Sequence, residues 1–152
     1  MKIMIVDDDI LVTTALKTIL EADSSIQVCA TGADGPEALR LYEIHHPDVL
    51  LMDIRMKGMD GLEASRRILA RHPQARILLL TTFSDDGYIV QALKAGVKGY
   101  LLKQDYTSIV PALHAVCRDQ TVFGKEIISR IPDLLQKKGD FPYKDFHITE
   151  KE

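Results

Sequence analysis

The strongest constraint on the fold of this sequence is a regular alternation between short apolar runs and segments with helical spacing. Each of five apolar runs is followed by a segment whose apolar residues recur every three or four positions. The runs lie at residues 2–6, 26–31, 48–53, 75–82 and 98–103. Strands that alternate with helices through short connections form parallel sheets covered on both faces. The alternation predicts an α/β fold: a five-stranded, doubly wound parallel sheet with helices on both faces.

Details of single segments refine this prediction. The third run, 48–53, is continuously apolar until its final aspartate, which is typical of a strand buried on both faces. Gly96 should end the fourth helix. The fifth helical segment, 108–117, contains Pro111, which a helix tolerates near its first turn. We therefore expect the fifth helix to begin close to Pro111.

The apolar pattern divides the chain into three parts. With 152 residues and 46% hydrophobic composition, the sequence holds enough apolar material for one substantial core, which we assign to a domain over residues 1–120. From Thr121 onward, a helical stripe is interrupted by Pro132, and the polar stretch KKGDFPYKDFH follows. We interpret 121–148 as a linker with a partial helix, and 149–152 as the start of a further domain.

The overall composition argues against several functional classes. The formal net charge is −3, so the surface as a whole should not attract DNA or an anionic membrane. The sequence has no apolar stretch near the ~20 residues that cross a bilayer, and its first apolar run is too short for a signal peptide. Its two cysteines lie far apart, without metal-ligand spacing. These features predict a soluble, cytoplasmic protein.

Polar side chains follow several of the predicted strands where each one ends. Asp7 and Asp8 come after the first run, Asp53 ends the third, Thr81 ends the fourth and Lys103 ends the fifth. Ligands of such sheets bind in the crevice beyond the carboxyl ends of the strands. The plainer interpretation of acidic residues is a solvated loop. Because acids from separate strands should meet here, we instead expect a cation site.

These residue types suit phosphoryl transfer. Carboxylate oxygens are ligands of Mg²⁺, which keeps waters that a phosphate can replace. A carboxylate can also act as a nucleophile and form an acyl phosphate, and Asp53, at the end of the most apolar strand, is the best-placed candidate. We expect a cation to bridge Asp8 and Asp53, while Lys103 and a threonine hydroxyl each hold a phosphoryl oxygen.

Four motifs in order, IVDDD, LLMDIRMKGMDG, LLLTT and KGYLLK, resemble the receiver domain of bacterial two-component response regulators over about residues 1–120. The resemblance implies a flavodoxin-like (CheY-like) fold in which Asp53 is the phosphoacceptor. It further implies that Mg²⁺ is held by Asp8, Asp53, the backbone carbonyl of Arg55 and, through water, Asp7. The phosphoryl donor would be a phosphohistidine of a sensor histidine kinase. Such a protein is not an enzyme: its chemistry is limited to its own phosphorylation and dephosphorylation.

The same resemblance implies a switch. Thr81 would be the switch hydroxyl, Lys103 the phosphate-binding lysine and Tyr100 the switch aromatic residue. Our hypothesis is that phosphorylation of Asp53 draws the Thr81 hydroxyl inward and makes room for the Tyr100 ring, which would promote homodimerisation. Where many family members have proline after the lysine, this sequence has Gln104, so we expect a trans peptide bond there.

The C-terminal residues point to a subfamily. The polar linker and the segment ITEKE are similar to the LuxR-type (NarL/FixJ-type) response regulators, in which a helix-turn-helix domain begins with such a segment. Thr149 and Glu152 also have capping-box spacing, which predicts the start of a helix. We therefore expect a transcriptional regulator whose DNA-binding domain is missing here, so that DNA would be contacted only through that domain.

Two alternatives stay open. A haloacid-dehalogenase-like phosphatase would use Asp7 and Asp9 as its D-x-D pair, with Thr81 and Lys103 downstream. The acid pair that should follow the lysine is not visible, and Asp53 would have no role. A stand-alone receiver that acts by protein contact is the second alternative, although the linker and the capping box do not fit it.

Overall fold

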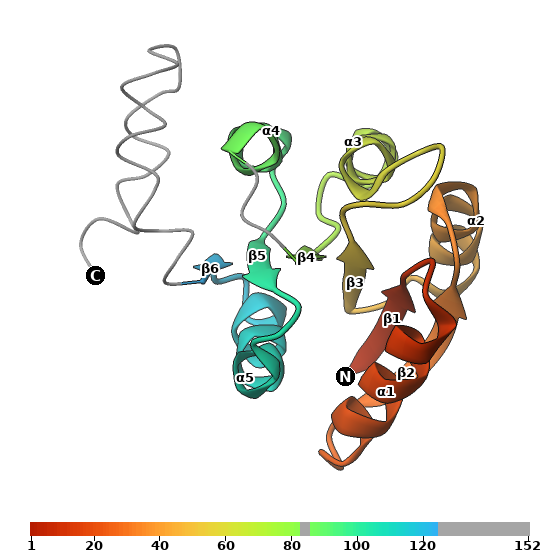
Figure 1. The fold of residues 1–152 in the computed structure, drawn as a ribbon, viewed down its shortest axis with the longest axis vertical. Coiled ribbons are helices and arrows are strands. Elements are labelled where there is room, and N and C mark those ends of the chain that lie inside the picture. The colour runs from red at the N-terminus through yellow and green to blue at the C-terminus, as the bar shows by residue number, and fades with distance from the viewer. Residues whose placement is uncertain (83–85, 125–152) are drawn as a thin grey trace.

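The computed structural model describes residues 1–82 and 86–124, and it contains one six-stranded parallel sheet in the order β2-β1-β3-β4-β5-β6 (Figure 1). The strands are β1 (Lys2–Val6), β2 (Gln27–Gly32), β3 (Val49–Asp53), β4 (Ile77–Thr81), β5 (Gly99–Leu102) and β6 (Val122–Phe123). The helices are α1 (Ile10–Glu21), α2 (Gly35–His45), α3 (Gly61–Arg71), α4 (Asp86–Ala95) and α5 (Tyr106–Cys117). The predicted class, a doubly wound parallel α/β fold, is confirmed.

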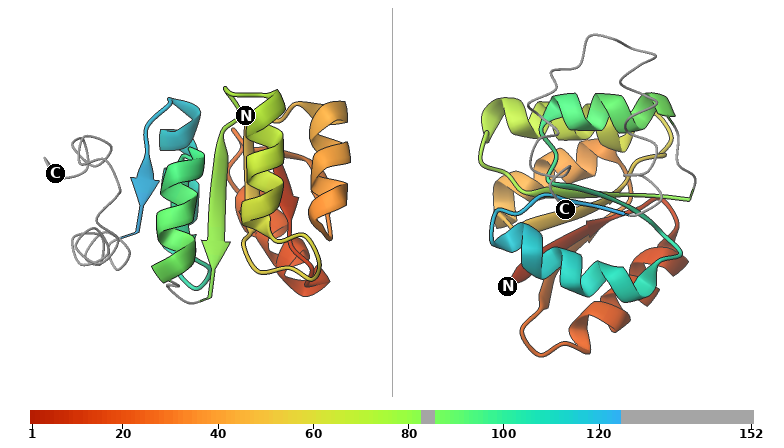
Figure 2. Two further views of the ribbon diagram at one scale, coloured as in Figure 1. Left: turned by 90° about the horizontal axis from the view of Figure 1, so that it is seen from above. Right: turned by 90° about the vertical axis from the view of Figure 1, so that its left-hand side faces the viewer.

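The helices cover the sheet in two layers, α1 and α5 on one face and α2, α3 and α4 on the other (Figure 2). Strand β3 shows why. Its five residues are all buried, with Leu50 and Met52 in the core beneath α2, α3 and α4, and Val49 and Leu51 in the core beneath α1 and α5. Side chains of a strand alternate between faces, so a central strand covered twice must be apolar throughout.

The sheet has one strand more than the sequence predicted. Val122 pairs with Gly99 and Phe123 with Tyr100, so the sheet continues past residue 120. The Phe123 ring stacks near the Tyr100 ring, with 6.4 Å between centroids. Two residues are too few to show a period, and a polar turn precedes them, which explains why the apolar pattern did not reveal β6.

The expected start of α5 is also wrong. The helix begins at Tyr106, so Pro111 is its sixth residue and lies in the second turn rather than the first. A proline there removes a hydrogen bond to the carbonyl four residues earlier. Pro111 lies on the solvent-exposed side of α5, where water can satisfy that carbonyl.

Other expectations meet mixed outcomes. All peptide bonds of the described residues are trans, including the one between Lys103 and Gln104, as predicted. Helix α4 ends before Gly96, which has a φ of +95°. Among the described helices, none has the length and hydropathy needed to span a membrane. The expected partial helix and the capping box at Thr149 fall on residues 125–152, outside the described part.

Candidate functional site

The carboxyl edge of the sheet, where the parallel strands end, holds the side chains that the sequence singled out. Asp7 directly follows β1, and Asp53 is the last residue of β3; these two strands are neighbours, with Val6 opposite Met52. Thr81 ends β4, and its carbonyl accepts a hydrogen bond of 2.7 Å from the Lys103 amide just beyond β5. The topology therefore brings residues almost a hundred positions apart to one edge.

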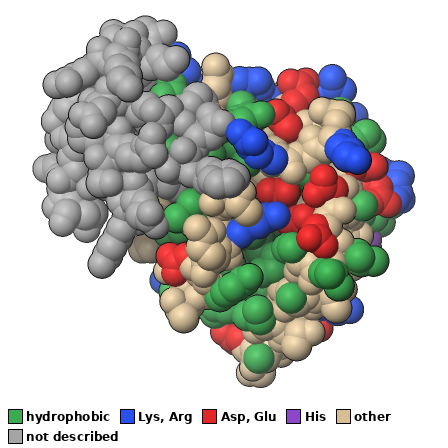
Figure 3. Space-filling model, in the orientation of Figure 1, with side chains coloured by type: hydrophobic (Ala, Val, Ile, Leu, Met, Phe, Trp, Pro, Cys, Tyr) green, Lys and Arg blue, Asp and Glu red, His purple; other side chains and the backbone are tan. Residues whose placement is uncertain are grey.

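Three acids and one lysine converge at this edge. Carboxylate oxygens of Asp7, Asp8 and Asp53 lie within 4.8 Å of one another. The Lys103 ammonium lies 2.7 Å from Asp7 Oδ2 and 3.3 Å from Asp53 Oδ2. Asp7 and Asp53 are buried, whereas Asp8 is exposed. On the face shown in Figure 3, acidic side chains gather near the centre with Lys and Arg side chains beside them.

The negative charge of the Asp53 carboxylate is only partly balanced by its surroundings. Burial, followed by the charge of Asp7, raises the pKa of Asp53 from 3.8 to about 6, and Lys103 offsets only part of this effect. Burial by itself would lower the pKa of the Lys103 ammonium, but the contacts with Asp7 and Asp53 outweigh it and raise that pKa. One ammonium thus faces two buried carboxylates and a third at the surface.

The donor set fits a hard divalent cation. Three carboxylates within reach of one point, one of them open to solvent, offer the oxygen ligands and the access to water that Mg²⁺ requires. Burial and then the charge of Asp7 raise the pKa of Asp53, and a bound cation would favour its ionised form. Among the residues that the structure describes, no other group of three or more potential metal ligands comes as close together.

Asp9, the third aspartate of the IVDDD motif, has a structural role. Asp9 is the N-cap of α1, and its side chain accepts a hydrogen bond of 2.9 Å from the Leu11 amide. Its own amide donates to Asp7 Oδ1 at 2.9 Å, so the cap also orients a carboxylate of the site. The acidic run therefore combines two site residues with one helix cap.

The backbone behind Asp53 is closely packed. Gly61, the first residue of α3, approaches the Asp53 carbonyl so closely that a Cβ at this position would collide with it. The Gly61 amide donates a hydrogen bond of 2.8 Å to the Ile54 carbonyl. Because no side chain fits between these segments, the start of α3 fixes the position of the β3 end that carries Asp53.

The two predicted switch residues lie on neighbouring strands. Thr81 is buried at the end of β4, and Tyr100 is fully buried on β5, in the core shared with α4. The structure thus places Thr81 at the carboxyl edge and Tyr100 further back, three residues before Lys103, rather than at the acids themselves.

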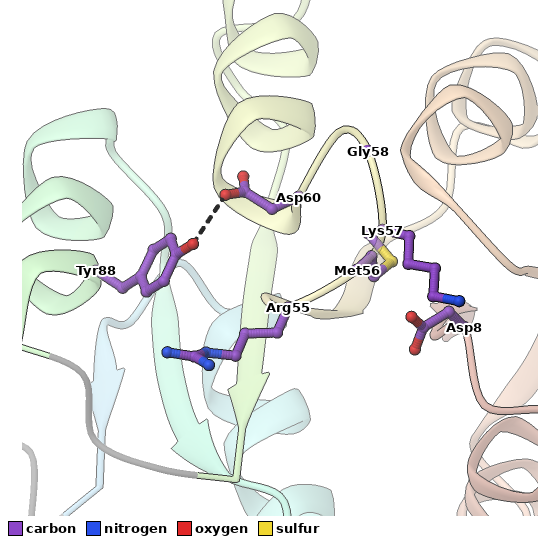
Figure 4. A pocket seen from close by; sticks show the side chains of 7 residues that line it. All are labelled: Asp8, Arg55, Met56, Lys57, Gly58, Asp60 and Tyr88. Atoms are coloured by element: carbon purple, nitrogen blue, oxygen red, sulfur yellow. Dashed lines mark hydrogen bonds between the residues drawn. The ribbon is translucent and has the colours of Figure 1, made fainter.

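Sequence reasoning missed a cavity beside the acids, with a volume of about 480 Å³ (Figure 4). The cavity is lined by Asp8, Arg55, Met56, Lys57, Gly58, Asp60 and Tyr88. The Arg55 guanidinium lies over the Tyr88 ring at 5.8 Å from its centroid, and the Tyr88 hydroxyl donates to Asp60 Oδ2 at 3.1 Å. Asp60 precedes a helical stripe, as an N-cap should, but no spacing rule links it to Tyr88.

Comparison with known proteins agrees with this geometry. Residues 3–114 match the model of the response regulator receiver domain, so the chain belongs to the family of two-component response regulators. It is 34% identical over 152 residues to the response regulator protein VraR of Staphylococcus aureus, covering 99% of this chain and 71% of VraR. It is 38% identical over 118 residues to the transcriptional regulatory protein DegU of Brevibacillus brevis, covering 77% of this chain. The chain spans about half the length of DegU.

Solved structures support the same assignment. A LuxR-family two-component response regulator from Aurantimonas sp. is 32% identical, with a TM-score of 0.83 over 87% of this chain and 95% of that one. The signal receiver domain of the response regulator NarL from Mycobacterium tuberculosis is also 32% identical, with a TM-score of 0.73 over 77% of this chain and 95% of that one. The resemblance to LuxR-type (NarL-type) receivers is therefore confirmed.

Proposed function

We propose that Asp53 accepts a phosphoryl group from a phosphohistidine of a sensor histidine kinase. The observation that carries this proposal is the Lys103 ammonium, which lies within 3.3 Å of both Asp7 and Asp53 at the carboxyl edge. A lysine in this place can hold a phosphoryl oxygen while a carboxylate beside it attacks. A solvated acidic loop would not place a largely buried ammonium between two buried carboxylates.

The proposed reaction is a single displacement at phosphorus. A carboxylate oxygen of Asp53 forms a bond to phosphorus, the P–N bond of the phosphohistidine breaks, and the released imidazole nitrogen keeps the electron pair and takes up a proton. Lys103 holds one phosphoryl oxygen and the Thr81 hydroxyl another. In the return reaction, water attacks the acyl phosphate, inorganic phosphate leaves and the carboxylate is restored. The protein thus turns over only its own phosphoryl group and is not an enzyme.

Mg²⁺ is the proposed cofactor. Asp8, Asp53 and the backbone carbonyl of Arg55 would hold the ion, with Asp7 bound through water. When bound, Mg²⁺ would supply the positive charge that balances the carboxylates and the incoming phosphoryl oxygens. The charge of Lys103 alone leaves the pKa of Asp53 at about 6, so roughly a tenth of the carboxyl is protonated and not nucleophilic near neutral pH.

The output that we propose is a change of association state. Phosphorylation would draw the Thr81 hydroxyl toward the phosphoryl group and favour the inward position of Tyr100. Since Tyr100 is fully buried already, phosphorylation would stabilise an arrangement that the chain reaches without it. The phosphorylated receiver would then form a homodimer in the cytoplasm and align DNA-binding domains of the whole regulator.

The deciding experiment is incubation with acetyl phosphate and Mg²⁺, followed by intact mass spectrometry and peptide mapping. We expect the wild type to gain one labile phosphoryl group at Asp53 and the variant Asp53→Asn to gain none. The matched control is Asp34→Asn, because Asp34 is an N-cap at α2 and asparagine caps equally well. Incorporation that survives Asp53→Asn would contradict the proposal.

Size-exclusion chromatography with light scattering tests the output in the same samples. We expect the wild type and Asp34→Asn to dimerise when acetyl phosphate and Mg²⁺ are present, and Asp53→Asn to stay unchanged. Dimerisation of Asp53→Asn that still depended on the phosphodonor would contradict the proposed link between Asp53 and association.

A further inference from the structure

Three side chains beside the phosphoacceptor form a bridge between separate elements. Arg55 follows β3, Tyr88 lies in the first turn of α4, and Asp60 is the N-cap of α3. The guanidinium of Arg55 lies over the Tyr88 ring, and the Tyr88 hydroxyl donates to Asp60 Oδ2. The other carboxylate oxygen, Asp60 Oδ1, accepts from the Glu63 amide at 2.8 Å, so the acceptor of the Tyr88 hydroxyl is itself fixed.

The backbone of Arg55 adjoins Asp53, whereas its charged group lies over the Tyr88 ring. The Arg55 amide donates to Asp53 Oδ1 at 3.4 Å, so its backbone adjoins the phosphoacceptor. Its side chain, however, extends toward Tyr88 and away from Asp8 (Figure 4). A guanidinium binds phosphoryl oxygens well, through paired charge-assisted hydrogen bonds. The long cation of Arg55, two residues from Asp53, therefore does not extend toward the place where a phosphoryl group would attract it most (Figure 4).

We propose that Tyr88, fixed by Asp60, positions Arg55 away from the phosphoryl group and thereby keeps the acyl phosphate open to water. This inference rests on the proposed function of Asp53. In the hydrolysis step, a water oxygen bonds to phosphorus opposite the Asp53 oxygen, the P–O bond to Asp53 breaks, and phosphate and a proton leave. That water arrives from the cavity side, where Arg55, Tyr88 and Asp8 form the walls.

Release of Arg55 from the bridge should slow hydrolysis of the acyl phosphate. Without the ring beneath it, the guanidinium can turn to the phosphoryl oxygens and occupy the approach of the water. The acyl phosphate then lasts longer. Tyr88 is a positioning residue in this scheme, because its effect acts entirely through Arg55. The bridge would thus set how long the signal lasts.

The experiment measures loss of phosphate from purified phosphorylated protein, after removal of acetyl phosphate, in the presence of Mg²⁺. We expect Tyr88→Ala to lengthen the acyl-phosphate lifetime by about threefold or more, and Tyr88→Phe, which keeps the ring, to lengthen it less. In the Arg55→Gln background, Tyr88→Ala should have no further effect, because residues that act through one another are not additive.

A control separates the bridge from general loosening of α4. Arg66 on α3 donates to Gln91 on α4, away from the cavity, so Gln91→Ala removes a different α3–α4 contact and should leave the lifetime at the wild-type value. An unchanged lifetime in Tyr88→Ala, or an effect that persists with Arg55→Gln, would overturn the proposal. If the wild type took up no phosphate at all, the proposed function of Asp53 would fail instead. Thermal melts of every variant identify any that do not fold.

Discussion

The two edges of the sheet place similar side chains in opposite electrostatic situations. At the amino edge, where the strands begin, exposed or half-exposed acids lie beside histidine or arginine side chains. The closest contacts are Asp23 with His114 at 3.1 Å, Glu43 with His72 at 2.8 Å and Arg76 with Asp119 at 2.9 Å. Hydrogen bonds from Ser25 and then His114 lower the pKa of Asp23 to about 2. Bonds from His72 and Arg76 likewise lower the pKa values of Glu43 and Asp119.

At the carboxyl edge the balance is reversed. Asp7 and Asp53 are buried beside each other, Asp8 adds a third carboxylate, and Lys103 is the cation that contacts both buried acids. The pKa of Asp53 is raised to about 6 as a result. Paired acids at one edge hold loops and helix ends in place. Surplus negative charge at the other edge costs stability until a ligand balances it, which is typical of a functional site.

Removal of the Lys103 charge should have the largest effect on the free energy of unfolding. In Lys103→Met, two buried carboxylates lose their cation, and we expect the free energy of unfolding to fall by about 3 kcal/mol near pH 8. The loss should shrink near pH 5, where Asp53 can take up a proton. Urea unfolding at both pH values measures this, with Lys17→Met on the exposed side of α1 as the control. Equal losses at both pH values would indicate lost packing rather than lost charge.

Removal of the charge of Asp53, the proposed phosphoacceptor, should stabilise the protein in the absence of ligands. Because the pKa of Asp53 is raised, the folded state binds the proton more tightly than the unfolded state. The associated stability is present below the ordinary pKa of 3.8 and is lost as the pH rises through about 6. Asp53→Asn should therefore gain up to about 3 kcal/mol above pH 7 and little near pH 4.

Urea unfolding across this pH range tests the expectation for Asp53→Asn. The variant Asp34→Asn, an equivalent change at an exposed cap, should follow the wild type at every pH. A wild-type stability that rose with pH between 4 and about 6, relative to Asp53→Asn, would mean that the carboxylate is favourably compensated. The contrast between the two edges would then not hold.

The fold could be predicted because its elements repeat with clear periods. The continuous apolar run of β3 marked a strand buried twice, and the helical stripes marked the helices. Strand β6 was missed because two residues show no period. Pro111 led to a wrong start for α5, because the solvent-exposed side of this helix tolerates a proline in the second turn. In both cases, neighbouring elements rather than local sequence decide the outcome.

The candidate site was predictable for a topological reason. In a parallel sheet every strand ends at the same edge, so the sequence alone places Asp7, Asp53 and Lys103 together. The bridge between Arg55 and Tyr88 could not, because it depends on how a loop and the first turn of α4 direct their side chains. The roles assigned to these residues stay predictions until phosphorylation is measured.

Mg²⁺ should stabilise the protein through the carboxyl edge. At tenfold above its dissociation constant, an ion that binds only the folded state adds about 1.4 kcal/mol. Its affinity should fall as the pH drops below about 6, because Asp53 must release a proton to bind it. Thermal melts with Mg²⁺ and with EDTA, at several pH values, measure both effects. Melting temperatures of the wild type that coincide, or a shift that survives Asp8→Ala, would contradict the predicted cation site.

The smallest change in stability should come from a substitution at the amino edge. Its sign should be opposite to that of Asp53→Asn. Glu43→Gln makes the same kind of change as Asp53→Asn, a carboxylate to an amide. Here, however, the pKa of Glu43 is lowered by the hydrogen bond from His72, so its charge contributes stability above its ordinary pKa of 4.5. That contribution disappears as the pH falls through the lowered value. Glu43→Gln should therefore lose a little stability near neutral pH and none in acid, because an exposed pair in water contributes weakly. Urea unfolding of both amide variants over one pH series compares the edges directly, and a gain in stability for Glu43→Gln at neutral pH would show that the amino edge carries surplus charge as well.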